Sequence, residues 1–259
     1  MASAQLLKQW HVEALDVRVF PDKKTLSEAA ADRVATILSR AAQTRGRAVA
    51  VFATGASQFD FLAALRTRGG IDWAHVTAFH LDEYVGMSPD HPASLRRYLR
   101  EHLFDAVRMG EIHFLAGDTP NAQAECERYG RLLREKGPAD IACIGIGENG
   151  HIAFNDPHVA DFNDPAMVKV VDPDEPCRRQ QFGEGWFPTF DAVPTLALTQ
   201  TIPAIMSARA ISCVVPERRK AEAVRNALKG PIAASCPASV LRRHSNCILY
   251  LDQESASLL

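Results

Sequence analysis

Short apolar runs alternate with longer segments of helical spacing along most of this chain of 259 residues. The runs have the length of buried strands, and the segments between them have the length of amphipathic helices. Such alternation is typical of βαβ units. It predicts an α/β fold with a single doubly wound, mostly parallel sheet and helices on both faces, in a Rossmann-like arrangement. No shift in composition marks a second domain, so we expect one domain over residues 1–259.

The pattern assigns each segment to an element. Strands are expected at 47–54, 76–81, 111–115, 139–144, 167–171, 211–215 and 247–251. Helices are expected at 26–44, 58–67, 92–104, 122–136, 193–207 and 216–228. The first helix begins near the cap candidate Ser27, and the helix at 193–207 has a break at Pro203. The last helix has Pro216 at its first position and Gly230 past its end, an arrangement that helices favour.

The most informative segment is the loop GIGENGHIAFNDP at 145–157, which follows the apolar run at 139–144. Its glycines let the backbone turn tightly and approach a ligand. An amide, an imidazole and a carboxylate then follow within eight residues, at Asn149, His151 and Asp156. Functional residues of open α/β sheets gather at the carboxyl ends of the strands. The spacing therefore predicts an active-site loop.

A second strand end carries two adjacent carboxylates, Asp82 and Glu83. Carboxylates that are buried without a purpose are costly, because loss of water disfavours the charged form. The same effect raises the pKa of a carboxyl group and makes it a useful general base. A solvated turn leading into the following loop is the alternative, and we favour the functional interpretation.

Two further positions suit an anion. Thr54, Gly55, Ala56 and Ser57 lie between a strand and a helix, where free backbone amides and the helix dipole attract negative charge; an ordinary cap by Ser57 is the alternative. Lys220 lies in the first turn of a helix, where its charge opposes the dipole unless it binds an anion such as phosphate. A solvated helix start compensated by Glu217 is the alternative, and from these residues alone we prefer it.

Arg178 and Arg179 form an adjacent basic pair. Such a pair is usually exposed on the surface. Where it faces a crevice, its guanidinium groups can bind a phosphate through paired hydrogen bonds. The aromatic residues that follow, Trp186, Phe187 and Phe190, are interpreted as a cover for the core or a mobile flap rather than as a cofactor site.

Composition narrows the classes of function. Lys and Arg total 29 against 31 Asp and Glu, and no basic tract is present, which argues against a nucleic-acid partner. Apolar runs are far shorter than the roughly 20 residues of a membrane span, and the amino terminus does not read as an export signal. The six cysteines form no CxxC pair and the histidines form no HExxH motif, which favours a cytoplasmic protein with reduced thiols and no metal. The sequence has no GxGxxG with the following acidic residue of a dinucleotide site and no P-loop, so neither a dinucleotide nor ATP is indicated.

The segments FHLDEYVGMSPDHPAS at 79–94 and GIGENGHIAFNDP at 145–157 closely resemble the glucosamine-6-phosphate deaminase family. Members are sugar-phosphate isomerase-deaminases that yield fructose 6-phosphate and ammonia. The resemblance extends over most of the chain, with the Thr-Gly at 54–55, Val-Pro at 193–194 and Lys-Ala at 220–221 in the expected order. It implies a homo-oligomer and neither a metal nor an organic cofactor.

The resemblance also implies roles for the candidate residues. Asp82 matches the carboxylate that moves a proton between carbon-2 and carbon-1 of the opened sugar. His151 matches the imidazole that moves the ring-oxygen proton, and Asn149 and Asp156 match the pair that orients and polarises it. Gly55 to Ser57 and Lys220 match phosphate-binding positions, and either Arg178 or Arg179 matches the family's phosphate arginine.

The chain departs from the family pattern at several of these positions. Many members have aspartate at the position of Asn149, and an amide cannot raise the basicity of the histidine by charge. Members usually have glutamate at the position of Asp156, whose side chain is one methylene shorter. A displacement near 1 Å costs on the order of 100-fold in a proton transfer. The segment at 177–187 also differs from that of the best-known members.

These observations lead us to expect an aldose–ketose isomerase that deaminates glucosamine 6-phosphate. Two alternatives stay open. A 6-phosphogluconolactonase-type hydrolase shares the fold and the glycine-rich loop, but we expect Ser-Leu-Phe-Pro there in place of residues 153–156. A non-catalytic or impaired sugar-phosphate sensor would normally carry a DNA-binding segment, for which the first 25 residues are too short and insufficiently basic.

Overall fold

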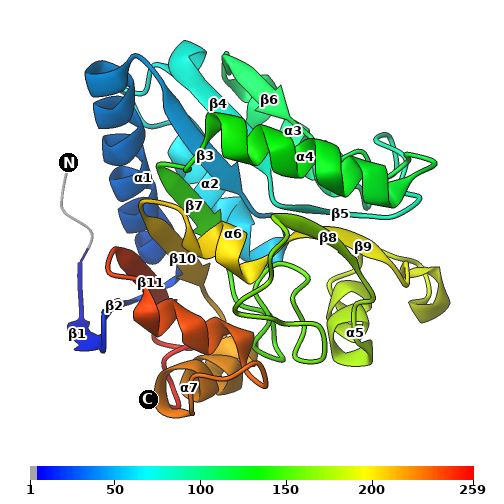
Figure 1. The fold of residues 1–259 in the computed structure, drawn as a ribbon. Coiled ribbons are helices and arrows are strands. Elements are labelled where there is room, and N and C mark those ends of the chain that lie inside the picture. The colour runs from blue at the N-terminus through cyan, green and yellow to red at the C-terminus, as the bar shows by residue number, and fades with distance from the viewer. Residues whose placement is uncertain (1–4) are drawn as a thin grey trace.

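The computed structural model describes residues 5–259 and has a mostly parallel sheet at its centre (Figure 1). Its eight strands lie in the order β1-β2-β11-β10-β7-β3-β4-β6, and only the β1–β2 pair is antiparallel. The strands are β1 (Lys8–Val12), β2 (Leu15–Phe20), β3 (Ala48–Phe52), β4 (Val76–His80), β6 (Glu111–His113), β7 (Ile141–Ile144), β10 (Ile211–Val215) and β11 (Cys247–Asp252). The expected α/β fold is confirmed.

Helices cover both faces of this sheet (Figure 1). Side chains of a strand point alternately to its two faces, and those of β3 show this clearly. Val49 and Val51 pack into one apolar core, while Ala50 and Phe52 pack into the other. The first core includes side chains of α4 (Ala122–Lys136), α6 (Ile202–Met206) and α7 (Ala221–Lys229). The second includes side chains of α1 (Lys23–Arg45), α2 (Phe59–Arg66) and α3 (Leu95–His102).

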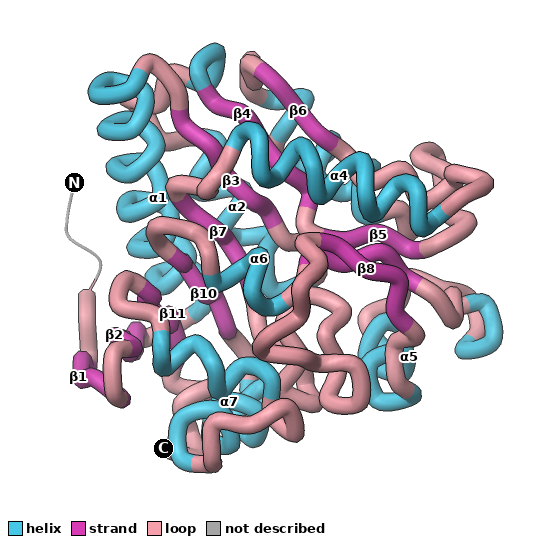
Figure 2. The backbone as a smooth tube through the Cα atoms, viewed as in Figure 1, coloured by secondary structure: helices cyan, strands magenta, loops and turns pink. Residues whose placement is uncertain are grey.

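A second, smaller sheet lies beside the first (Figure 2) and was not expected. It is antiparallel and has the order β5-β9-β8, formed by β5 (Asp82–Tyr84), β9 (Ala197–Gln200) and β8 (Val168–Val171). One residue, Leu81, separates β4 from β5. The chain therefore leaves the large sheet just before Asp82. Aromatic side chains such as Tyr84 and Phe187 join this sheet to α5 (Glu175–Gly183) in a third apolar core.

Three predicted element boundaries are wrong. The first helix begins at Lys23 with Asp22 as its cap, since the Asp22 carboxylate accepts the Thr25 N–H, and Ser27 is buried inside the helix. The helix expected at 216–228 starts later, because a short 3-10 turn at Arg218–Lys220 precedes α7. The helix expected at 92–104 is shorter than predicted and is capped by Ser94.

The helix expected at 193–207 is also wrong. Its first part forms strand β9, and only Ile202–Met206 is helical. Residues 197–200 are buried on both faces between β5 and β8, so no polar face distinguishes this strand from a helix in the sequence. Within the described part of the chain, no helix combines the length and apolarity that crossing a bilayer needs.

Candidate functional site

Loops that follow β3, β4 and β7 meet in one pocket at the carboxyl ends of these strands. The chain places β4 on one side of β3 and β7 on the other, so the strand order reverses here. Such a reversal opens a crevice above the sheet, where ligands of α/β proteins bind. The lining includes the predicted residues Thr54, Gly55, Ala56, Ser57, Asp82, His151 and Lys220.

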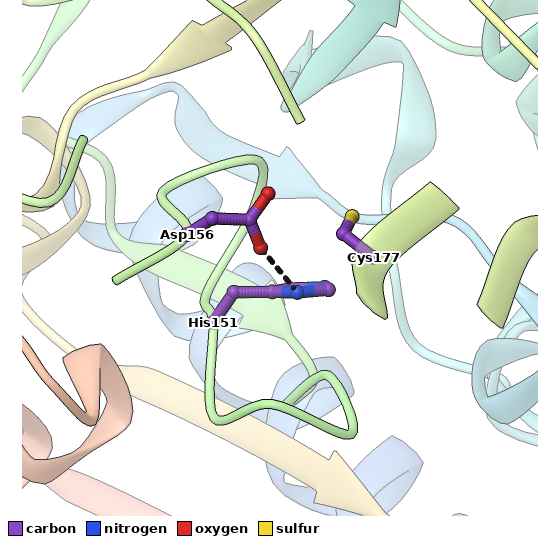
Figure 3. Close-up of side chains that lie close together, drawn as sticks. All are labelled: His151, Asp156 and Cys177. Carbon is purple, nitrogen blue, oxygen red and sulfur yellow. Dashed lines mark ion pairs between the residues drawn. The ribbon is translucent and has the colours of Figure 1, made fainter. Parts of the chain in front are cut away.

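His151, which lines the pocket, forms a close pair with Asp156 (Figure 3). The imidazole Nδ1 lies 2.9 Å from Oδ1 of Asp156. Burial opposes ionisation of Asp156, but the His151 imidazole, the Asn149 amide and the Asp174 N–H together hold its pKa below the usual value. The ring packs so closely on Gly147 that a Cβ there would lie 2.1 Å from it. Glycine at 147 is therefore a requirement for this imidazole position.

Asn149 supports the pair indirectly. Its Nδ2 donates to Oδ1 of Asp156 at 2.8 Å and also to the carboxylate of Asp174, and its Oδ1 accepts the backbone N–H of His151. The loop is not extended here, because Gly150 has a φ of 87°. Even so, Asn149 and His151 both reach Oδ1 of Asp156, at 2.8 Å from the amide nitrogen and 2.9 Å from the imidazole Nδ1. The amide positions Asp156 and does not bond the imidazole ring.

The adjacent carboxylates Asp82 and Glu83 have different surroundings. Glu83 is fully buried and accepts hydrogen bonds from Ser94 and Arg96 and from backbone N–H groups at the start of α3. Asp82 is 7% exposed and lines the pocket, and its Oδ1 has no hydrogen-bond partner within residues 5–259. Burial, together with the nearby Glu83, raises the pKa of Asp82 to about 8. Glu83 thus anchors the start of α3, whereas the Asp82 carboxyl group is available to exchange a proton with a ligand in the pocket.

Residues 54–57 and Lys220 form what we call the anion cradle. Gly55 has a φ of 100°, which turns the chain sharply between β3 and a 3-10 turn at Ala56–Gln58. Ser57 does not cap this turn. Lys220 is only 2% exposed, and no hydrogen bond or ion pair of its Nζ occurs among the described residues. Burial, and secondarily the charge of Arg219, lower the pKa of Lys220 to about 8. A buried cation beside free amides suits a phosphate group.

Comparison with known proteins identifies the family. A family model described as glucosamine-6-phosphate isomerases/6-phosphogluconolactonase matches residues 21–250. The chain belongs to this family. A glucosamine-6-phosphate deaminase of Exiguobacterium sibiricum is 41% identical over 80% of the chain and 79% of its own length. One from Arthrobacter is 34% identical over 95% of the chain and 93% of its own length.

Solved structures agree with this assignment. A structure described as a monomeric glucosamine-6-phosphate deaminase is 33% identical, with a TM-score of 0.87 over 94% of this chain and 99% of its own. A 6-phosphogluconolactonase from Shewanella baltica is 21% identical, with a TM-score of 0.75 over 91% of this chain and 96% of its own. The second comparison supports the fold alone. The family resemblance seen in the loops at 79–94 and 145–157 is confirmed.

The predicted phosphate role of Arg178 or Arg179 does not fit the structure of this family member, because neither side chain lines the pocket. Arg178 donates to the carbonyl of Val193 and stacks over the ring of Phe190. Arg179 is exposed and pairs with Glu175 one helical turn away. The side of α5 that faces the pocket is instead formed by Gln180 and Gln181, and Glu184 follows them at the end of the helix.

Sequence reasoning missed the residues that α5 brings to the site. Asp174 caps α5 and bonds Asn149, Cys177 lies beside the His151–Asp156 pair, and Gln181 and Glu184 line the pocket. Positions 177, 181 and 184 share one helix face by their spacing of four and three residues. A capping aspartate followed by Pro176 was the available signal for this helix.

The donor atoms of His151, Asp156 and Cys177 lie within 4.8 Å of one another, which is close enough to consider a metal (Figure 3). The imidazole Nδ1 already faces Asp156. Burial and the charge of Asp156 raise the pKa of the Cys177 thiol well above its usual value, whereas a metal binds the thiolate. The imidazole nitrogen nearest to the other two side chains therefore already has a partner.

Proposed function

We propose that this chain converts glucosamine 6-phosphate to fructose 6-phosphate and ammonia by acid/base catalysis without a metal. The observation that carries the proposal is the composition of one pocket. It combines an unpartnered buried carboxylate at Asp82, a His151–Asp156 pair and an anion cradle with Lys220. The names of the relatives from Exiguobacterium and Arthrobacter support the same reaction.

The chemistry follows from the position of each group. The anion cradle binds the substrate phosphate and fixes the sugar along the pocket. His151 takes the proton of the carbon-1 hydroxyl and delivers it to the ring oxygen as the carbon-1 to ring-oxygen bond breaks, and ionised Asp156 stabilises the imidazolium that forms in between. Asp82 then takes the proton from carbon-2, which gives an enolamine with a hydroxyl at carbon-1, and returns the proton to carbon-1. The amine loses a proton in exchange for the one gained by the carbon-1 oxygen, so carbon-2 ends as an imine. Water adds to this imine, and ammonia leaves.

The two alternatives make different demands on the site. A 6-phosphogluconolactonase would hydrolyse a lactone and has no need of a base that moves a proton between two carbons. The solved lactonases are similar in fold at low identity, which carries no reaction to this chain. A sugar-phosphate sensor would use the anion cradle and leave Asp82 idle.

One experiment separates the three functions. Purified protein is incubated with glucosamine 6-phosphate or with 6-phosphogluconolactone, without added metal or nucleotide. Release of ammonia is measured with the first substrate and disappearance of the lactone with the second. Ammonia release supports the deaminase, and lactone hydrolysis without ammonia supports the lactonase. Binding of the amino-sugar phosphate without turnover would overturn both enzymatic functions in favour of a sensor.

A cytoplasmic location and a homo-oligomeric state stay predictions. All six cysteines are free and buried, which suits a reducing compartment. The solved deaminase at 33% identity is described as monomeric. Measurement of the mass in solution against 28.4 kDa for one chain tests the oligomeric state.

A further inference from the structure

A carboxylate of the protein itself lies at the anion cradle. Glu184 follows the last turn of α5, and its side chain is only 5% exposed. Oε2 lies 3.5 Å from the backbone nitrogen of Ala56, one of the cradle amides, and accepts the Trp186 indole N–H at 3.0 Å. Oε1 accepts from Gln180 at 3.0 Å and from Arg219 at 2.8 Å. A negative group thus lies where a phosphate would approach.

The surroundings keep this carboxylate charged. Burial opposes its ionisation, but the Trp186 N–H and the charges of Arg219 and Lys220 hold the pKa of Glu184 below its usual value. Arg219 is shared with two more carboxylates, those of Glu148 and Glu217. Lys220, by contrast, pairs with none of the three among the described residues, although all three lie close enough to raise its pKa. The anion cradle therefore contains the Lys220 ammonium near the Glu184 carboxylate, whose oxygens already accept hydrogen bonds from Trp186 and Arg219.

We propose that Glu184 is a specificity-determining residue that competes with the substrate phosphate for the anion cradle. The inference rests on the proposed function, because it takes a sugar phosphate as the ligand. A phosphate dianion has more negative charge than one carboxylate and therefore interacts more strongly with Lys220 and with the amides of residues 55–57. It should for this reason displace Glu184. A neutral sugar has no group that can do so. Glu184 thereby discriminates against sugars that lack the phosphate.

Displacement also has a consequence for α5. Glu184 ends the helix that carries Gln181 and Cys177 to the catalytic side of the pocket. When the carboxylate leaves Ala56, its hydrogen bond from the Trp186 indole changes as well. The emission of Trp186 therefore reports on the event directly.

The test measures the affinity of inorganic phosphate for the full-length protein and for Glu184→Gln. Gln keeps the shape of the side chain and removes its charge, so phosphate should bind about fivefold more tightly. Glu148→Gln is the matched control. It removes a carboxylate from the same Arg219, but outside the cradle, and should change the affinity less than about twofold. Glu184→Ser serves as a second variant, with the same expected direction.

Each outcome decides a separate point. Equal affinities in wild type and Glu184→Gln, equal gains in the Glu184 and Glu148 variants, or the absence of phosphate binding in all proteins would overturn the inference. Lys220→Met distinguishes its failure from failure of the proposed function. If that variant binds phosphate as well as wild type, the cradle itself is wrong. Phosphate should also shift the emission of wild type, and this shift should vanish in Trp186→Phe and shrink in Glu184→Gln.

Discussion

At the scale of single residues, the site depends on how differently neighbours are solvated. Asp82 and Glu83 are adjacent, yet one has an orphan oxygen in a pocket and the other has donors on both oxygens. The residue types predicted that two carboxylates at a strand end have a purpose, but only the family resemblance singled out Asp82, and neither gave a role to Glu83. That role depends on the start of α3, which only the folded chain brings against Glu83.

The pH dependence of activity follows from Asp82 and Lys220. Asp82 acts as a base only when ionised, and its pKa is raised to about 8, so kcat should rise up to about pH 8. Lys220 loses its charge as the pH passes its lowered pKa of about 8, so KM for the sugar phosphate should rise above that pH. The ratio kcat/KM should therefore peak near pH 8. A profile that is flat from pH 6 to 9 would exclude these two groups as the titrating ones.

Asp82 should also limit stability. Its pKa is about 8 in the folded protein and 3.8 unperturbed, so the folded protein binds the extra proton between these values and the free energy of unfolding falls as the pH rises. Asp82→Asn removes the buried charge and should raise the free energy of unfolding by on the order of 2 kcal/mol at pH 8 and by less at pH 5. Urea denaturation at both pH values measures this. Asp90→Asn, at an exposed position, is the control, and an equal response of the two variants would contradict the account.

The carboxylate of Asp156 should matter for turnover and not for phosphate binding. Asp156→Asn removes the negative partner of the His151 imidazole, so kcat should fall about 100-fold. The affinity for inorganic phosphate should not change, because the anion cradle lies on other loops. A variant with normal kcat would show that the pair found at 2.9 Å has no part in catalysis.

At the scale of elements, the parallel strands β3, β4, β7, β10 and β11 of the large sheet were predicted well, because they read as continuous apolar runs. The antiparallel pair β1–β2 at one end of the large sheet was missed, although residues 15–20 alternate between buried and half-buried positions over most of β2. Strand β9 was mistaken for a helix since all its side chains are buried. Helix α5 was missed, and with it the orientation of Arg178 and Arg179. The direction in which a helical side chain points can be predicted only when the residue at which the helix begins is known.

The join between β5 and α3 should be the most sensitive element contact near the site. Glu83→Gln removes the buried carboxylate that pairs with the buried Arg96 and leaves this arginine only the half-exposed Asp118, so it should lower the free energy of unfolding by on the order of 3 kcal/mol. Glu101→Gln also removes a carboxylate partner from an arginine of α3, Arg97, but both are exposed. It should have no measurable effect. Denaturation of the two variants side by side gives the comparison, and equal effects would refute the anchoring role of Glu83.

At the scale of the whole molecule, one chain brings Asp82, His151 and the anion cradle into the same pocket, from loops after β3, β4, β7 and β10. The specific activity should therefore be independent of protein concentration, whatever the mass in solution. Assays from nanomolar to micromolar protein, with the mass measured in parallel, check this. Activity lost on dilution together with a fall in mass would mean that a second copy completes the site.

The central claim is that Asp82 moves the proton that converts an amino-sugar phosphate to its keto form. The most direct test is ammonia release from glucosamine 6-phosphate by wild type and by Asp82→Asn, with phosphate binding measured on both proteins. We predict turnover by wild type, no detectable turnover by the variant, and undiminished phosphate binding by both. Ammonia release by Asp82→Asn at a rate near that of wild type would contradict the claim.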